Sequence, residues 1–136
     1  MTKYYVDSCI WLNLLNREQN KVHGTPVWKI AKEFLKQHQG KIIISDVVFR
    51  EIINKVRNPE ELKRIDEVLE ITPPDIEEKA LVKEIESKEM YNLSFFDYIH
   101  ISIAKTRGYI LITRDKELLE RGQRYTTTLK PENCIY

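Results

Sequence analysis

The sequence lacks long hydrophobic runs, paired cysteines and an excess of charge of either sign. Its only two cysteines, Cys9 and Cys134, are far apart and form no CxxC motif, so neither a disulfide framework nor a thiolate zinc site is expected. Apolar runs are strand-sized, well short of the ~20 residues that a membrane span needs. The first residues also lack the apolar core of a secretory signal. We therefore expect a cytoplasmic protein that has no contact with a membrane.

The balance of charge argues against a protein that holds nucleic acid by bulk positive charge. Lys and Arg total 22 and Asp and Glu total 21, which gives a formal net charge of +1. A small basic patch beside an acidic site stays compatible with this average. The 136 residues, 42% of them hydrophobic, suit one globular domain. We predict a single domain over residues 1–136.

Strand-like and helix-like segments alternate along the chain. Strands are predicted at residues 3–6, 41–45, 70–72, 109–113 and 134–136. Helices are predicted at residues 8–16, 26–37, 46–56, 60–69, 75–91, 94–105 and 115–120. Thr25 would cap the second helix, with Pro26 at its first position. Strands that alternate with helices need crossover connections, so we predict an α/β fold, a three-layer α/β/α sandwich with a mostly parallel central sheet.

Three of the predicted strands are followed at once, or nearly so, by an aspartate: Asp7, Asp46 and Asp115. In open parallel sheets, ligands bind outside the carboxyl ends of the strands, which is where Asp7 and Asp115 should lie. Each aspartate is also a good cap for the helix that follows. For Asp46 we adopt the capping interpretation, in which either it or Ser45 begins the helix.

Two further acids, Glu51 and Asp97, occupy positions where a solvated side chain is not expected. The residues three and four positions before Glu51 are valines, which puts Glu51 at the margin of an apolar stripe. Asp97 lies in a helix that is apolar over most of its circumference, with Phe95 and Phe96 on another apolar side. Such a helix is expected to be buried, and Asp97 at least partly buried with it.

We therefore expect four of these acids to form a cluster at one edge of the sheet: Asp7, Glu51, Asp97 and Asp115. Clustered carboxylates repel one another, and a divalent cation relieves the repulsion. Mg²⁺ and Mn²⁺ prefer oxygen ligands, and without paired His or Cys ligands they are favoured over zinc. A metal held in this way can polarise a phosphodiester, activate water and stabilise a leaving oxygen. Buried, hydrogen-bonded structural acids are an alternative that the pattern alone leaves open.

Four segments that contain these acids, residues 5–8, 45–52, 93–104 and 110–118, resemble the motifs of the PIN domain in the expected order. The resemblance is to the small VapC-like ribonucleases of toxin–antitoxin modules, and it covers nearly the whole chain. It implies a Mg²⁺- or Mn²⁺-dependent endoribonuclease that cleaves single-stranded RNA through metal-activated water. The catalytic residues and metal ligands that it implies are Asp7, Glu51, Asp97 and Asp115. Ser8 and Thr113 would help to order the site.

The sequence departs from the family pattern near the third acid. Tyr98 stands where the family often has a small residue, and Asp46 where it often has a hydroxyl residue. His100, three residues after Asp97, could reach substrate, but a packed histidine is the preferred interpretation. Whether Asp46 or His100 takes part in the site stays open.

The resemblance also suggests partners. Basic residues near the acids are candidate contacts for the phosphates of single-stranded or structured RNA: Arg50, Lys55, Arg114 and Lys116. Family members of this size usually form homodimers and are inhibited by a small antitoxin protein, so we expect both.

Two other functions of a PIN-like domain compete with a toxin, and a different fold is a third alternative. One is a housekeeping RNA-processing nuclease on the same scaffold. The other is an inactive PIN-like module that binds RNA or protein, which the presence of all four acids disfavours. A phosphoryl-transfer fold of haloacid-dehalogenase type would need a second aspartate two residues after Asp7, and Cys9 stands there.

Overall fold

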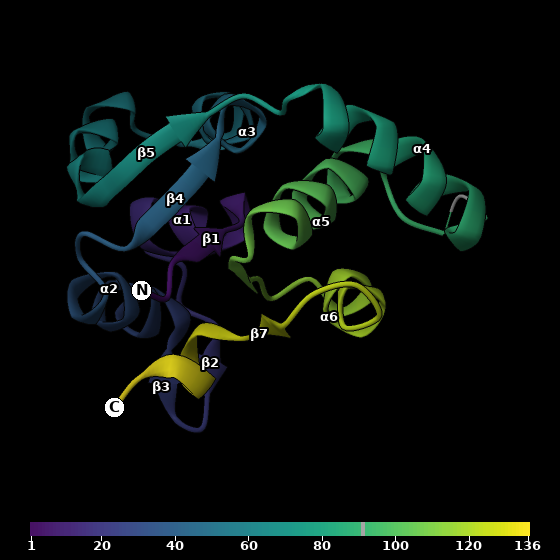
Figure 1. Cartoon of the computed structure of the whole chain (residues 1–136). Coiled ribbons are helices and arrows are strands. Elements are labelled where there is room, and N and C mark those ends of the chain that lie inside the picture. Colours follow the sequence, from purple (N-terminus) through teal and green to yellow (C-terminus); the bar gives the residue numbers. More distant parts are fainter. Residues whose placement is uncertain (91) are drawn as a thin grey trace.

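The computed structural model describes residues 1–90 and 92–136. Its centre is a five-stranded sheet in the order β5-β4-β1-β6-β7, and each pair of neighbouring strands runs parallel (Figure 1). The strands are β1 (Tyr4–Val6), β4 (Ile42–Ser45), β5 (Val68–Thr72), β6 (Ile110–Ile112) and β7 (Thr128–Leu129). The mostly parallel sheet of the predicted fold class is confirmed.

Helices cover both faces of this sheet. The α-helices are α1 (Ser8–Leu15), α2 (Val27–Gln37), α3 (Asp46–Lys55), α4 (Ile76–Glu89), α5 (Phe95–Arg107) and α6 (Lys116–Gly122). Right-handed crossovers in this strand order put α1 to α3 on one face and α4 to α6 on the other. Accordingly, α1 packs against α2 and α3, whereas α4 packs against α5. No helix of the described residues is long and apolar enough to cross a membrane.

The central strands are unbroken apolar runs because helices cover both of their faces. Tyr5 of β1 lies between Ile43 of β4 and Leu111 of β6, and all three side chains are fully buried. The chain leaves β1 toward β4 and leaves β6 toward β7, so the strand order reverses between β1 and β6. Parallel sheets bind their ligands at such a switch point. Asp7 follows β1 at this place.

Short polar side chains begin the helices that leave this edge. Ser45 caps α3, because its Oγ accepts a hydrogen bond from the backbone N–H of Val48 at 3.2 Å. Of the two residues that the sequence offered as the cap, Ser45 is therefore the one that caps the helix, and Asp46 is the first residue of the helix. Ser94 caps α5 in the same way. The predicted end of the preceding helix, at residue 91, lies outside the described residues.

The N-terminal half of the chain contains a small hairpin that the sequence analysis missed. Thr25–Pro26 form β3, which pairs in antiparallel fashion with β2 (Lys21–Val22), so the predicted cap at Thr25 is wrong. His23 and Gly24 make the turn, both with positive φ, at 49° and 81°. Two residues of positive φ match the twist of a tight hairpin. The helix begins after this hairpin.

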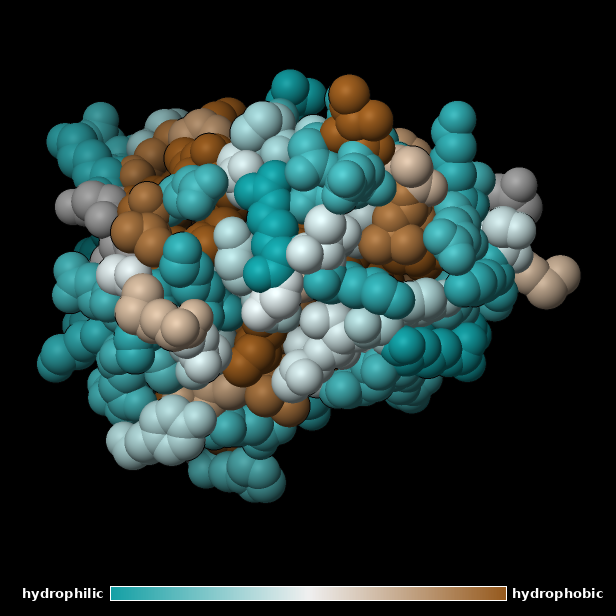
Figure 2. Space-filling view, viewed as in Figure 1, coloured by the Kyte–Doolittle hydropathy of each residue, from teal (hydrophilic) through white to brown (hydrophobic). Residues whose placement is uncertain are grey.

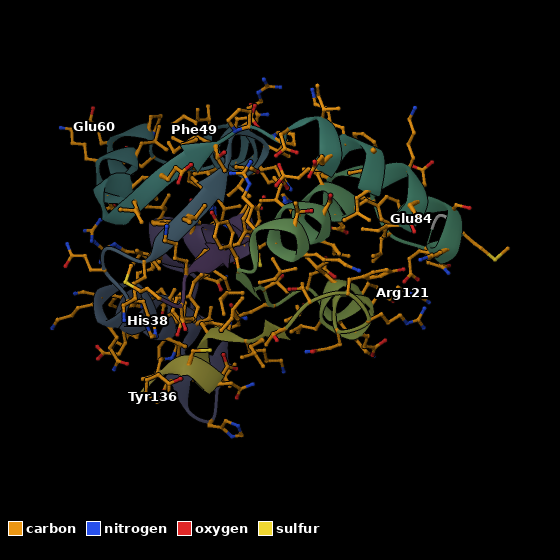
Figure 3. All side chains as sticks on the ribbon, viewed as in Figure 1. His38, Phe49, Glu60, Glu84, Arg121 and Tyr136 are labelled. Carbon is orange, nitrogen blue, oxygen red and sulfur yellow. The ribbon has the colours of Figure 1, made fainter. Side chains whose placement is uncertain are left out.

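The C-terminal segment also differs from expectation. The strand predicted at residues 134–136 is wrong, because Pro131 opens a 3-10 turn, η2 (Pro131–Cys134), after β7. This end of the chain packs on the end of α2 (Figure 3). His38 Nε2 donates to the backbone oxygen of Cys134 at 2.7 Å, and the rings of His38 and Tyr136 lie 6.1 Å apart. The helix predicted at residues 60–69 is a 3-10 helix, η1 (Pro59–Glu67).

Apolar side chains remain at the surface in separate patches. Figure 2 shows hydrophobic side chains over β5 and over the α4–α5 region, divided by hydrophilic ones. Phe95 and Phe96 are 57% and 49% exposed, so the expected burial of their helix does not extend to these two residues. They lie in its first turn, before the buried stretch that begins at Tyr98.

Two buried carboxylates hold α4 in place. Glu78 has no exposed surface and accepts hydrogen bonds from Arg107 of α5 at 2.7 and 2.8 Å. At the other end of α4, Glu89 accepts from Arg121 and Arg124 at 2.9 and 3.1 Å; Figure 3 labels Arg121 on α6. Packing and charge pairing together fix α4 against its neighbours.

The pairing of Glu78 predicts a large effect on stability. Arg107→Met should lower the free energy of unfolding by about 3 kcal/mol, because the charge of Glu78 stays buried without its partner. Lys88→Met is the control, since Lys88 pairs with Glu84 at the surface. It should change the same quantity by less than about 0.5 kcal/mol. Urea unfolding measures both, and equal effects would contradict the interpretation.

Candidate metal centre

Asp7 is held from two sides at the carboxyl end of β1. Its Oδ1 accepts from the backbone N–H of Ser8 at 2.8 Å and so caps α1. Its Oδ2 accepts from Thr113 Oγ1, at the end of β6, at 2.8 Å. The side chain is almost fully buried. Asp7 therefore both caps a helix and presents a fixed carboxylate at the switch point of the sheet.

Glu51 reaches the same place from α3. Its Oε2 accepts from Ser8 Oγ at 3.3 Å, and its Oε1 lies 3.2 Å from His100 Nε2. Ser8 therefore contacts two acids: its backbone N–H donates to Asp7, and its hydroxyl donates to Glu51. The two hydroxyl residues named from the sequence, Ser8 and Thr113, each contact a carboxylate of the cluster.

Asp97 and Asp115 complete the acidic group. Asp97 lies in the first turn of α5, and the charges of Asp7 and Asp115 both act on it. Asp115 caps α6 through Leu118 N–H at 3.1 Å and is exposed. Its own N–H donates to Thr113 Oγ1 at 3.1 Å. The group thus runs from the buried Asp7 to Asp115 at the surface.

His100 belongs to this cluster, and the sequence analysis gave it too small a role. It is a packed histidine, as preferred there, but its Nε2 lies 3.2 Å from Glu51 Oε1 and 3.7 Å from Asp7 Oδ1. Ligand atoms of Asp7, Glu51 and His100 all lie within 4.8 Å of one another. The available signal was the spacing of three residues from Asp97, which puts both side chains on one face of α5.

The protonation equilibria of these groups depend on one another. Burial raises the pKa of Asp97, and the charges of Asp7 and Asp115 raise it further, although His100 opposes them. Burial acts against ionisation of Glu51 too, but the hydrogen bond and charge of His100 bring the pKa of Glu51 below its ordinary value. Burial favours neutral His100, yet Glu51 and Asp7 raise the pKa of His100 overall. His100 therefore offsets part of the charge of the acids, whereas the ionised form of Asp97 stays disfavoured, chiefly by burial.

The donor atoms fit a divalent cation. Carboxylate oxygens are the ligands that Mg²⁺ and Mn²⁺ take in proteins, and an imidazole nitrogen suits transition metals. Cys9 offers no thiolate: its Sγ lies 3.5 Å from Asp7 Oδ2, and burial raises the pKa of the thiol far above its ordinary value.

The basic residues named from the sequence occupy two kinds of position. Arg50, Lys55 and Lys116 are exposed. Lys55 is close enough to lower the pKa of Glu51. The guanidinium of Arg114, by contrast, pairs with Glu132 at 2.9 Å, and its side chain is only 14% exposed. This pairing takes up the groups with which Arg114 would contact a phosphate.

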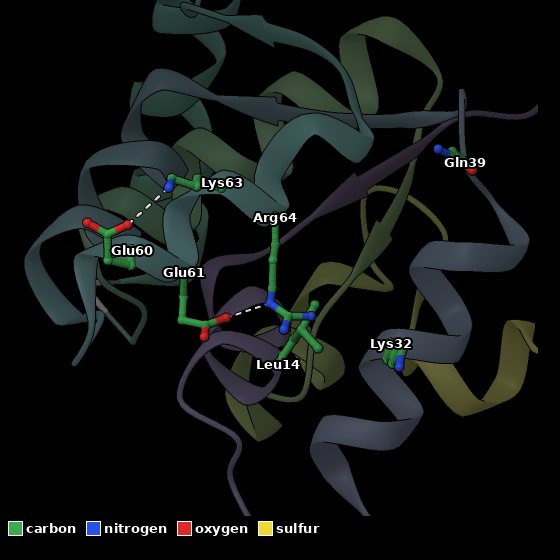
Figure 4. Close-up of a pocket in the computed structure, with 7 residues that line it drawn as sticks. All are labelled: Leu14, Lys32, Gln39, Glu60, Glu61, Lys63 and Arg64. Carbon is green, nitrogen blue, oxygen red and sulfur yellow. Dashed lines mark hydrogen bonds and ion pairs between the residues drawn. The ribbon is translucent and has the colours of Figure 1, made fainter.

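Two hollows in the surface differ in whether they reach the acidic cluster. One of about 140 Å³ adjoins the cluster and is lined by Val47, Arg50, Glu51, Asn54 and Phe96. Another, of about 540 Å³, lies between α2 and η1 (Figure 4). None of the four acids lines it, and the charged side chains that η1 contributes pair with one another, Glu60 with Lys63 and Glu61 with Arg64. The smaller hollow is the one that meets the cluster.

Comparison with known proteins identifies the family. The model of the PIN domain family matches residues 4–123. No curated protein matches the chain. The fold is similar to that of DNA-bound VapBC from Salmonella typhimurium, with a TM-score of 0.70 and 17% identity, covering 96% of this chain and 99% of that chain. It is also similar to FitAcB from Neisseria gonorrhoeae, with a TM-score of 0.68 and 14% identity over 95% and 98%.

A third similar structure is PAE2754 from Pyrobaculum aerophilum, with a TM-score of 0.62 and 17% identity over 98% of this chain and 94% of that chain. At these identities the likeness concerns the fold alone. The family itself follows from the sequence match, which spans most of the chain and includes all four acids. This chain belongs to the PIN domain family.

Proposed function

We propose that this protein is a divalent-metal-dependent endoribonuclease of single-stranded RNA and the toxin of a toxin–antitoxin pair. The observation that carries the proposal is the close approach of Asp7, Glu51 and His100, whose ligand atoms lie within 4.8 Å of one another at the switch point of a PIN domain, with Asp97 and Asp7 near enough for their charges to interact. The proposed catalytic residues and metal ligands are the four acids Asp7, Glu51, Asp97 and Asp115. A bound divalent cation would supply Lewis acidity and an activated water to phosphodiester hydrolysis.

The protein's own contribution is to hold the acids still. Asp7 receives hydrogen bonds on both oxygens, from Ser8 N–H and Thr113 O–H, which fixes the plane of its carboxylate. Glu51 is held likewise by Ser8 and His100. Carboxylates fixed before substrate arrives need no reorganisation during the reaction, which is where electrostatic catalysis gains most.

Features beside the cluster support single-stranded RNA as the substrate. Arg50, Lys55 and Lys116 are exposed and can contact phosphates. The ring of Phe96, 49% exposed, lines the hollow next to Glu51. Aromatic side chains stack on bases that are free of a duplex. A strand bound across the cluster could therefore place a base on Phe96 and a phosphate at the acids.

The proposed role as a toxin is supported by structures of the same fold. VapBC, FitAcB and a toxin–antitoxin complex from Klebsiella pneumoniae are among them. We accordingly propose a small antitoxin protein as a partner and a homodimer as the assembly. A housekeeping RNA-processing nuclease is the alternative, and it predicts no neighbouring reading frame whose product binds and inhibits this protein.

The purified protein should cleave single-stranded RNA in Mg²⁺ or Mn²⁺ and should not cleave it in EDTA. Asp97→Asn should slow cleavage by at least about 100-fold, because a lost ligand removes several kcal/mol of transition-state stabilisation. Glu60→Gln, at an exposed position of η1, is the matched control and should leave the rate unchanged. Cleavage that persists in EDTA would contradict the proposal.

The burial of Asp97, together with the charges of Asp7 and Asp115, predicts that Asp97→Asn stabilises the metal-free fold. The pKa of Asp97 is raised in the folded protein, so the free energy of unfolding falls as pH rises from the ordinary Asp value, about 3.9, through the raised one. Above the raised pKa, the variant should melt a few degrees higher than wild type in EDTA. Near pH ~4 the difference should shrink.

Thermal melts of both proteins across this pH range measure the effect. Glu120→Gln, at an exposed position of α6, controls for a change of charge alone. A variant that is no more stable than wild type at neutral pH would show that the cluster is not electrostatically strained.

A further inference from the structure

The two ring nitrogens of His100 lie in different surroundings. Nδ1 is 2.7 Å from the hydroxyl of Tyr5, and Nε2 faces the carboxylates of Glu51 and Asp7 at 3.2 and 3.7 Å. Only 1% of the residue is exposed, so water does not surround the ring. The protein groups around the ring therefore determine which nitrogens of His100 carry a proton.

A chain of hydrogen bonds decides which nitrogen carries a proton. The hydroxyl of Tyr5 donates to Ser45 Oγ at 2.7 Å, and Ser45 Oγ also accepts from the N–H of Val48. A phenol has one proton to donate, so the Tyr5 oxygen must accept from His100 Nδ1–H. In the neutral ring this arrangement leaves Nε2 as an unprotonated lone pair.

In the neutral ring that lone pair faces acceptors, whereas in the protonated ring Nε2–H donates to Glu51 Oε1, a proton whose place a bound cation would take. Asp7 and Glu51 are carboxylates, and the described residues place no donor opposite Nε2. Three buried acceptors turned toward one point are unfavourable unless a positive charge lies among them. The separations suit a metal ion, since two ligands each about 2.1 Å from one ion are about 3.0 Å apart at a right angle.

We propose that His100 Nε2, together with Asp7 and Glu51, is a ligand of a first-row transition cation, so that this site prefers Mn²⁺ to Mg²⁺. The inference rests on the proposed function, to which it adds a ligand and a metal preference. Mg²⁺ is selective for oxygen ligands, whereas an imidazole nitrogen strengthens the binding of transition metals.

The surroundings of the ring match those of metal-binding histidines. Such a histidine almost always donates its other N–H to a fixed oxygen, which orients the ring. Here the oxygen belongs to Tyr5, a fully buried residue of β1, and Tyr5 is itself held by the cap of α3. The elements β1, α3 and α5 together therefore orient Nε2 toward Asp7 and Glu51. A protonated ring that merely pairs with the two acids is the competing interpretation.

Binding of Mn²⁺ to the full chain separates the two. We expect wild type to bind Mn²⁺ at least about tenfold more tightly than Mg²⁺, and pulsed electron paramagnetic resonance of the bound Mn²⁺ to show coupling to a nitrogen. His100→Gln should lose the nitrogen coupling and most of the preference for Mn²⁺. His23→Gln, at an exposed histidine in the β2–β3 turn, is the control and should keep both.

A second variant keeps the proposal testable if His100→Gln does not fold. Tyr5→Phe preserves the packed ring and the histidine but removes the oxygen that accepts from Nδ1. It should weaken the binding of Mn²⁺ by about tenfold and that of Mg²⁺ by less.

Two results would overturn the inference, and they differ in what else they overturn. If Mn²⁺ binds without nitrogen coupling, and His100→Gln keeps the wild-type metal preference, then His100 is only an ion-pair partner and the proposed function stands. If neither metal binds to the wild-type protein, both proposals fail together.

Discussion

The convergence of carboxylates at the edge between β1 and β6 is the constraint on which the rest of this structure depends. Asp7, Glu51 and Asp97 come from three different elements and are brought together where the strand order reverses. Nothing in hydrophobic packing favours that arrangement. The fold stabilises this arrangement with hydrogen bonds. Asp7 caps α1, Thr113 donates to Asp7, Ser8 donates to Glu51, and His100 lies against both acids.

The same helices that stabilise the domain therefore position the site. Ser45 shows the connection: it ends β4, caps α3 and accepts from Tyr5, which in turn holds His100. A change in the register of β1 against β4 would move Tyr5, and with it the ring that contacts Glu51. The acidic cluster, the start of α3 and the sheet register thus form one cooperative unit. The ion pair between Glu78 of α4 and Arg107 of α5 fixes α5, and thereby the helix that carries Asp97.

Sequence patterns correctly predicted the strands, helices and burial that depend on local chemistry and on the general rules of parallel sheets. Apolar runs followed by an aspartate predicted β1, β6 and the edge at which Asp7 lies, and the position of Asp97 on an apolar helix predicted its partial burial. Features that depend on tertiary contact were missed. His100 was interpreted as packing because its partner Tyr5 is 95 positions away. The exposure of Phe96 and the pairing of Thr25–Pro26 with β2 depend likewise on neighbours that periodicity does not reveal.

The central claim is that this acidic cluster exists to hold a cation. Anomalous diffraction from a crystal soaked in Mn²⁺ tests it most directly. The account predicts an anomalous peak about 2.2 Å from carboxylate oxygens of both Asp7 and Glu51, on the side that faces Asp97. A well-ordered site that stays without such a peak at a saturating concentration of Mn²⁺ would contradict the account, and the acids would then be structural.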